Sequence, residues 1–245
     1  MDARMQATAV CRFTAFAAMG ESDLIALSRL ANGRRRVARG EFVCHEGDRP
    51  AGLYLLLKGW TASSLSFAGG SRQLLKIHLP GDMLGLPSLA LRHCADSIVA
   101  LTEVDLAIVA RRDLGALFER SPRLAALLFL ISQEERVAAM DRLASVGATD
   151  AARRLAAMLL HIHARLQRSD DTVGDAFDLP LTQEDVAALV GITPAHLSRV
   201  LLKFRTARLL TWTRHRIALI DRVGLAALSG LPVRELDRDA DWLPA

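Results

Sequence analysis

The chain lacks long apolar runs and has few cysteines, and both features narrow the class of protein it can be. No hydrophobic stretch among its 245 residues approaches the roughly 20 that a membrane-spanning helix needs, so we expect no membrane partner. Cys11, Cys44 and Cys94 are odd in number and widely separated, which argues against a disulfide framework and favours the reducing cytoplasm. Arg4 and Arg12 interrupt the alanine-rich N-terminus, so we expect no signal peptide.

The sequence also lacks the short motifs of common enzymes. It contains no P-loop, no dinucleotide-binding glycine fingerprint after a strand and no His-Glu-x-x-His sequence. His161 and His163 are two residues apart on a helical stretch, so their side chains point about 200° apart and cannot share a metal on one face. We therefore predict neither an enzyme nor a metal site.

Acidic residues are missing between Asp185 and Asp221. The basic residues there give the stretch a charge of +6, against +4 for the whole chain. Because neutralising phosphates gives DNA-binding proteins their affinity and salt dependence, the stretch predicts contact with nucleic acid. The alternative is an ordinary solvated basic face. The basic residues are Arg199, Lys203, Arg205, Arg208, Arg214 and Arg216.

Two capped helices are predicted around the start of this basic stretch. Thr182 and Asp185 have the spacing of a capping box, in which each side chain accepts a hydrogen bond from the other residue's backbone N–H. Gly191 suits the left-handed conformation that ends a helix. Thr193 followed by Pro194 then starts a second helix. The pattern predicts a helix-turn-helix.

The second predicted helix, Thr193 to Thr206, has one side for the protein and one for DNA. Helical spacing places Leu197, Val200, Leu201 and Phe204 on the inner side. Arg199 lies on the outer side, and because arginine is the commonest bidentate reader of guanine, we expect it to read a base. The other residues predicted at the DNA surface are Thr182, Gln183, Thr193, Pro194, Ala195, His196, Ser198, Lys203, Arg214 and Arg216.

A wing is predicted after the second helix. Residues 209–213 and 217–220 are rich in β-branched and apolar side chains, as strands are, and the basic segment 214–216 joins them. The tip lacks the glycine that a tight hairpin usually needs, so we expect a longer or less regular wing. Together with the two helices, this predicts a winged helix-turn-helix domain over residues 146–245, ending in a C-terminal tail.

Residues 1–110 have a different pattern, in which short apolar runs alternate with glycine turns after an N-terminal helical segment. Regularly spaced strands with turn residues between them are typical of an antiparallel sandwich or barrel, which we interpret here as a β-roll. The expected strands cover 41–44, 53–57, 60–67, 72–79, 97–101 and 104–109.

Residues 111–145 are predicted to be helical, with a short helix over 111–120 and a long one over 123–144. The long helix has two apolar stripes, so we expect it to pack on two sides: on its own roll and on a second copy of the chain. The alternative is a core helix of a single chain. One stripe, predicted as the dimer interface, is Leu124, Leu127, Leu128, Ile131 and Ala138; the second is Leu130, Val137, Met140 and Leu143.

A β-roll, a long helix and a winged helix-turn-helix in this order resemble the Crp/Fnr family of bacterial transcription regulators. The motifs that carry the resemblance are Gly40 to Phe42, Glu46 to Asp48, Leu53 to Gly59, Pro80 to Gly85 and, above all, Thr182 to Arg199. It implies an α+β fold with an N-terminal antiparallel roll like a cyclic-nucleotide-binding domain and a long dimerisation helix. It also implies a cytoplasmic homodimer that reads a two-fold operator in duplex DNA, with RNA polymerase as a further partner.

The resemblance places an effector pocket on the roll, and the chain departs from the family pattern there. Members that bind cyclic AMP use a glycine-glutamate-leucine and an arginine-serine pair, where this chain has Gly85-Leu86-Pro87 and Cys94-Ala95. A buried cyclic phosphate would lack its counter-charge unless a shifted loop supplied Arg92, so we predict no dependence on cyclic AMP. The predicted pocket residues are Gly85, Leu86, Pro87, Arg92, His93, Cys94 and Ala95.

Some members of the family carry a metal cofactor, either an iron-sulfur cluster or haem. Members that hold an iron-sulfur cluster have closely spaced N-terminal cysteines, whereas this chain has only Cys11 there, so we expect no cluster. Haem-binding members use a cysteine or histidine in the loop that contains His93 and Cys94, which leaves haem open. We interpret Cys44 and Cys94 as small buried hydrophobes, with redox sensing by an exposed thiolate as the alternative.

The predicted reading helix departs from the family pattern as well. Many members have a glutamate or an arginine-glutamate pair where this chain has Pro194 and Ala195, so its operator should share only part of the family consensus. Two other functions stay open at this point. The helix-turn-helix of an effector-binding or protein-interaction module could dock a protein in place of DNA, or the roll could be a scaffold that senses nothing.

Overall fold

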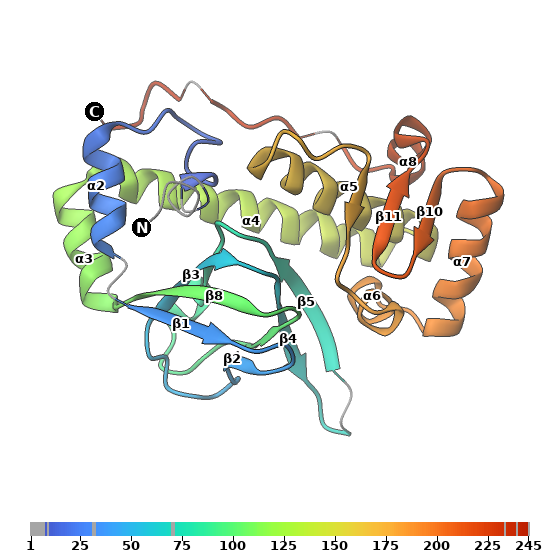
Figure 1. Cartoon of the computed structure of the whole chain (residues 1–245), viewed down its shortest axis with the longest axis horizontal. Coiled ribbons are helices and arrows are strands. Elements are labelled where there is room, and N and C mark those ends of the chain that lie inside the picture. Colours follow the sequence, from blue (N-terminus) through green and yellow to red (C-terminus); the bar gives the residue numbers. More distant parts are fainter. Residues whose placement is uncertain are drawn as a thin grey trace. The chain divides into compact units, whose positions relative to one another are not determined.

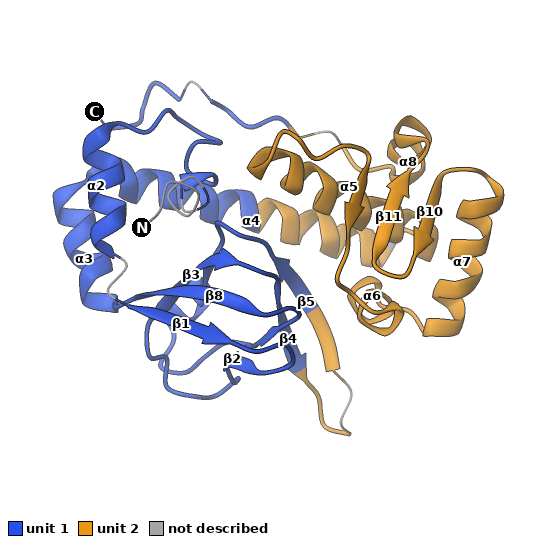
Figure 2. Ribbon diagram, in the orientation of Figure 1, with its two compact units in different colours: residues 1–65, 75–135, 235–245 blue, residues 66–74, 136–234 orange. Residues whose placement is uncertain are grey.

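The computed structural model describes residues 8, 10–30, 33–69, 72–232, 234–238 and 240–244 (Figure 1). Its contacts divide the chain into two compact units (Figure 2). The first comprises Met1–Leu65, Leu75–Glu135 and Glu235–Ala245, and the second comprises Ser66–Leu74 and Arg136–Arg234. The division falls inside the long helix, whereas the sequence placed a domain boundary near residue 145.

The first unit contains the β-roll expected from the sequence. Its strands form two four-stranded sheets, one in the order β1-β8-β3-β6 and the other in the order β2-β7-β4-β5. The pairings of β8 with β1 and β3, and of β7 with β2 and β4, are antiparallel. The strands are β1 (Arg34–Val37), β2 (Phe42–Cys44), β3 (Leu53–Lys58), β4 (Thr61–Ser66), β5 (Arg72–His78), β6 (Met83–Leu84), β7 (Ser97–Ala100) and β8 (Val104–Val109).

The predicted strands are confirmed to within one or two residues, but β6, of only two residues, was missed, and so was β1. Its sequence is mostly arginine, which gives no apolar alternation. Arg35 nevertheless packs over the ring of Tyr54, 5.9 Å from its centroid, and donates hydrogen bonds to the carbonyl oxygens of Phe42 and Val43. A cation therefore takes an inward position of the strand that an apolar residue usually takes.

Apolar side chains fill the interior of the roll. Leu56, Leu84 and Leu106 have no exposed surface, and Ile98 and Val104 are 1% exposed. They belong to one cluster with Val37, Val43, Tyr54 and Ala100. The short 3-10 helix η1 (Leu86–Ala90) follows β6 on the way to β7.

A second core lies under the helices of the first unit, α2 (Glu21–Leu30), α3 (Arg111–Arg120) and the start of α4 (Pro122–Ala148). The α4 side chains Leu124, Leu127, Leu128 and Ile131 are 0 to 6% exposed, and they pack with Leu53, Met83 and Val109 of the roll. The prediction that these four residues form a dimer interface is therefore wrong. This stripe covers the chain's own sheet, and Ala138, further along, is half-buried.

The second unit contains the winged helix-turn-helix that the sequence predicts. Its sheet has the order β10-β11-β9. β9 and α8 were not predicted, and β9 arises in an acidic segment whose only buried side chain is Phe177. The elements after α4 are α5 (Ala151–Ser169), β9 (Ala176–Asp178), α6 (Gln183–Val190), α7 (Pro194–Thr206), β10 (Leu210–Thr213), β11 (Arg216–Leu219) and α8 (Arg222–Ser229).

No single helix within the described part of the chain has the length and apolar composition of a membrane span. α6 and α7 reach that length and apolar composition only when they are counted together across the 95° bend between them.

Candidate nucleic-acid interface

The cap at the start of α6 has the geometry that the sequence predicts. The Thr182 hydroxyl accepts a hydrogen bond from the Asp185 N–H at 3.0 Å, and Asp185 accepts one from the Thr182 N–H, also at 3.0 Å. Gly191 ends the helix with a φ of 74°, a left-handed conformation that glycine adopts without steric strain. Local sequence thus determines where α6 begins and where it stops.

The reading helix α7 begins at Pro194, where the Thr193 hydroxyl accepts a hydrogen bond from the His196 N–H at 3.2 Å. Its predicted inner side is confirmed, because Leu197, Val200, Leu201 and Phe204 are buried. On the outer side, the Ser198 hydroxyl donates to the Pro194 carbonyl within the helix, so it already has a partner. The other predicted contacts on α7 and its cap are exposed: Thr193, Pro194, Ala195, His196, Arg199 and Lys203.

Arg199 therefore stands on the solvent side of a helix that is fixed at its start and held by four buried side chains. Thr182 and Gln183, at the start of α6, are exposed as well. Backbone and hydroxyl groups at helix starts are common phosphate contacts. In the second unit, the predicted DNA-facing residues of both helices are thus available to a ligand.

The wing is a tight hairpin, and the expectation of a longer or irregular one is wrong. Thr213 pairs with Arg216, which leaves only Arg214 and His215 in the turn. Arg214 takes the left-handed conformation, with a φ of 54°, in place of the expected glycine. The Trp212 indole N–H donates to the Arg214 carbonyl at 2.8 Å, which helps to hold this turn.

Arg214→Asn tests why an arginine occupies this left-handed position. Asparagine adopts the conformation more readily, so we expect unfolding of the variant to require roughly 1 kcal/mol more. If the guanidinium contacts phosphate, the same variant should bind DNA more weakly at every sequence, with a shallower salt dependence. Thermal melting and DNA titration would measure both effects, and His215→Asn is the control. Unchanged DNA affinity would contradict the assigned role of Arg214.

Carboxylates neutralise part of the basic surface next to the wing. Arg216 pairs with Asp178 of β9 at 3.2 Å, and Arg222 pairs with Asp175 at 3.1 Å. All four side chains are at least half exposed, so both pairs are screened by solvent. Asp178 offsets part of the charge that Arg216 offers to phosphate, whereas Arg214 is exposed in the turn.

The predicted effector residues differ in burial and in surroundings. Leu86 packs against the core beneath the helices, while Arg92 and His93 are exposed and Cys94 is buried. Ser88, which lies between them in sequence, accepts hydrogen bonds from Arg111 through its carbonyl and from the Ala95 N–H through its hydroxyl. The remaining predicted residues, Gly85, Pro87 and Ala95, belong to the same segment, which the hydrogen bonds of Ser88 help to hold in place.

A cyclic nucleotide does not fit the residues present. By the family resemblance, Leu86 and Cys94 stand where members that bind the nucleotide have the carboxylate and the guanidinium that hold ribose and phosphate. Within the described residues, no group of three or more histidine, cysteine, aspartate or glutamate side chains could hold a metal ion.

The thiols of Cys44 and Cys94 lie together in the roll. Burial, together with the neighbouring Cys94 and Asp96, raises the pKa of Cys44 from its ordinary 9.0 to about 12. Cys94 is 7% exposed, and its backbone N–H and carbonyl bond to Asp48 and Gly47. Both cysteines therefore behave as small packed side chains, and Cys44 stays protonated at neutral pH.

The raised pKa of Cys44 makes stability depend on pH in a definite direction. Above pH 9 the unfolded thiol loses its proton while the folded thiol keeps it, so the folded state loses relative stability as the pH rises. Urea unfolding of the parent and of Cys44→Ala at pH 8 and pH 10 should show a larger fall for the parent. Equal falls in the two proteins would refute this expectation.

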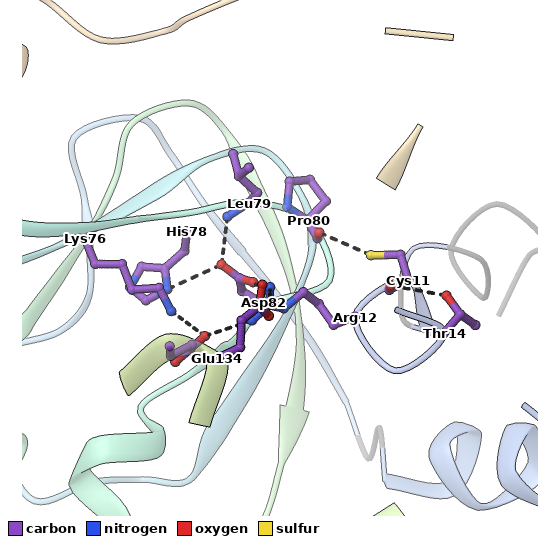
Figure 3. Close-up of polar contacts among 10 residues, drawn as sticks. Cys11, Arg12, Thr14, Lys76, His78, Leu79, Pro80, Asp82 and Glu134 are labelled. Atoms are coloured by element: carbon purple, nitrogen blue, oxygen red, sulfur yellow. Dashed lines mark hydrogen bonds and ion pairs between the residues drawn. The ribbon is translucent and has the colours of Figure 1, made fainter. Parts of the chain in front are cut away.

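A buried ionic cluster links three segments of the first unit (Figure 3). Arg12, 8% exposed, pairs with Asp82 at 3.4 Å, Glu134 at 2.9 Å and Glu135 at 3.4 Å. Lys76 also pairs with Glu135, at 2.5 Å. Next to Asp82, the His78 ring bonds to the Ser63 hydroxyl at 2.7 Å and lies 3.8 Å from the carboxylate.

The same N-terminal segment approaches the roll closely at Gly81. A Cβ atom there would overlap the Cys11 sulfur, and the Cys11 thiol donates to the neighbouring Pro80 carbonyl at 3.7 Å (Figure 3). Sequence reasoning treated Arg12 only as an interruption of the alanine-rich start and missed this cluster. The signal available in the sequence was the acidic pair Glu134 and Glu135, which follows the apolar run 124–131 of the long helix.

Comparison with known proteins gives matches along most of the chain. The model of the cyclic nucleotide-binding domain matches residues 34–121, and that of the Crp-like helix-turn-helix domain matches residues 153–228. The nitrogen fixation regulation protein FixK of Bradyrhizobium diazoefficiens is 29% identical, over 93% of this chain and 92% of its own. The transcriptional regulatory protein btr of Bordetella pertussis is 26% identical, over 86% and 87%.

A solved structure shares the fold. FixK2 from Bradyrhizobium japonicum superposes with a TM-score of 0.74 at 24% identity, covering 82% of this chain and 98% of that one. The order of roll, long helix and helix-turn-helix is thus found in a protein of nearly the same extent.

Proposed function

The chain belongs to the Crp/Fnr family of DNA-binding transcription regulators, and we propose that it reads a two-fold operator as a homodimer through α7. The observation that carries this proposal is the exposed Arg199 on a capped helix within a stretch free of acidic residues. Arg199 reads a base, while Thr182, Gln183, His196, Lys203 and Arg214 contact phosphates.

The dimer face is the exposed apolar side of α4. Met140, Leu143 and Val146 are 58%, 75% and 59% exposed in the second unit, and Phe129 of the same helix is 56% exposed in the first. Met140 and Leu143 belong to the second stripe seen in the sequence. A row of exposed apolar side chains on one helix is typical of an interaction surface, and a second copy of α4 offers the matching row.

Leu143→Glu tests this face. A carboxylate at the most exposed apolar position of the row would meet its own copy across the two-fold axis, so we expect the dimer dissociation constant to rise roughly tenfold to a hundredfold. Sedimentation of the purified protein at several concentrations would measure it. Arg72→Glu, which makes a charge change at an exposed residue outside α4, serves as the control. A variant that remains dimeric at the same concentrations would exclude this face.

The regulator is independent of cyclic AMP in this proposal, because the roll lacks the groups that would bind the nucleotide. Its location is the cytoplasm, in keeping with three free cysteines and a DNA target. We also propose contact with RNA polymerase, on the family resemblance alone, and the proposal includes no enzymatic step.

DNA binding at increasing salt tests the proposed function. The probe is a duplex selected from a random pool by the protein itself. With six to ten phosphates neutralised, the binding constant should fall by roughly a thousandfold or more between 50 and 200 mM salt. Weak binding without this dependence would favour a helix-turn-helix that docks a protein.

A further inference from the structure

The end of α6 is held by side chains from three other elements of the second unit. Gln73 of β5 donates to the Ala188 carbonyl, Arg142 of α4 donates to the Leu189 carbonyl at 2.6 Å, and Arg154 of α5 donates to the Val190 carbonyl at 3.0 Å. The last carbonyls of a helix have no partner within the helix, and cations at this end oppose the negative end of its dipole. We name Gln73, Arg142 and Arg154 the α6 clamp.

Two members of the clamp also bind other parts of the unit. Arg142 donates to the Leu74 carbonyl at 2.9 Å, so one guanidinium joins the start of β5 to the end of α6. Arg154 donates to the Thr149 carbonyl at 2.5 Å, in the connection between α4 and α5. Arg142 is half-buried, and this burial lowers the pKa of its guanidinium. The clamp therefore fastens α6 to α4, the helix that carries the proposed dimer face.

The first residues of β5 take part in this contact although the strand belongs to the roll sheet. Ser66–Leu74 group with the second unit, and the rest of β5 groups with the first (Figure 2). Gln73, which contacts the end of α6, is among the β5 residues that group with the second unit.

We propose that the α6 clamp positions the helix-turn-helix on α4 and so sets the distance between half-sites at which the two reading helices of a dimer bind together. The inference rests on the proposed function of a homodimer that reads two half-sites. Gln73 and Arg142 are positioning residues, because their contacts are with the protein backbone. When α6 is held in one position on α4, the second reading helix of the dimer has a high effective concentration at its half-site. When α6 can move, that reading helix samples many positions and its effective concentration falls.

The test compares DNA duplexes that differ only in half-site spacing. The full-length parent, Gln73→Glu and Arg142→Gln are titrated with the preferred two-half-site duplex, with duplexes lengthened or shortened by one or two base pairs, and with a single half-site. Arg72→Gln, at an exposed neighbour of Gln73, is the matched control, because all three substitutions change the charge by −1. Glutamate in place of Gln73 keeps the length but cannot donate to the Ala188 carbonyl.

For both clamp variants we expect affinity for the preferred spacing to fall roughly tenfold, affinity for the single half-site to change less than twofold, and the preference among spacings to flatten. Arg72→Gln should keep the parent's spacing profile. Equal losses on all duplexes, or an unchanged profile in Gln73→Glu, would overturn the clamp. Gln73 is half-buried, so this variant decides the matter if Arg142→Gln does not fold. If the parent's affinity for DNA neither depends on sequence nor falls steeply with salt concentration, the proposed function itself is overturned.

Discussion

Arg199→Ala is expected to weaken operator binding by on the order of 2 to 6 kcal/mol in the dimer, since each half-site loses about 1 to 3 kcal/mol. The side chain is exposed on the outer side of α7, while the residues that fix the helix point inward. Its removal should therefore leave the fold intact and affect DNA binding alone.

The expected loss is specific to one base pair in each half-site. Without the bidentate donor, guanine is no longer preferred over other bases at that position, whereas contacts to phosphate persist. Selection of bound sequences from a random pool should show relaxed choice at a single symmetric pair of positions. Affinity for unrelated duplex should fall far less than affinity for the operator.

Lys203→Ala is the matched control on the same helix. Lys203 is exposed, and we assign it to phosphate, so its removal should lower affinity on all sequences and reduce the salt dependence without changing base choice. If Arg199→Ala behaved in the same way as Lys203→Ala, or left the selected sequence unchanged, the readout assignment would be wrong.

Features encoded by local sequence could be predicted well. The capping box of Thr182 and Asp185 and the turn at Gly191 depend on neighbouring residues, so their spacing was sufficient. The inner side of α7 followed from helical periodicity, and the glycine-punctuated strands of the roll from alternation and turn residues. Most of the recognition surface could therefore be predicted from the sequence.

Choices between equivalent faces could not be predicted. The long helix has two apolar stripes, and periodicity does not say which one meets the roll and which one meets a partner. The structure buries Leu124 and Leu127 in the chain's own core and leaves Met140 and Leu143 exposed, the reverse of the prediction. The α6 clamp is unpredictable for a related reason, because Gln73 and Ala188 are 115 residues apart in sequence.

Arg12→Met is expected to destabilise the first unit by about 3 to 5 kcal/mol, the usual effect of removing one partner from a buried ion pair. Arg12 is paired with three carboxylates, of which Asp82 has no exposed surface. Methionine preserves most of the apolar contact of the side chain but supplies no positive charge. The carboxylates would then have lost their main counter-charge, with Lys76 and His78 as the remaining basic neighbours.

A pair of further variants separates charge from packing. In Arg12→Met/Glu134→Gln, one of the uncompensated carboxylates becomes a neutral amide, so part of the lost stability should return. Arg29→Met, at an exposed arginine of α2, is the control and should change stability by less than about 0.5 kcal/mol.

Urea unfolding of the four proteins at pH 7 would provide the comparison. Acidic pH should narrow the difference between Arg12→Met and the parent, because protonated carboxyl groups need no counter-charge. A loss below 1 kcal/mol, or a double variant no more stable than Arg12→Met, would show that the cluster does not fasten the N-terminal segment to α4.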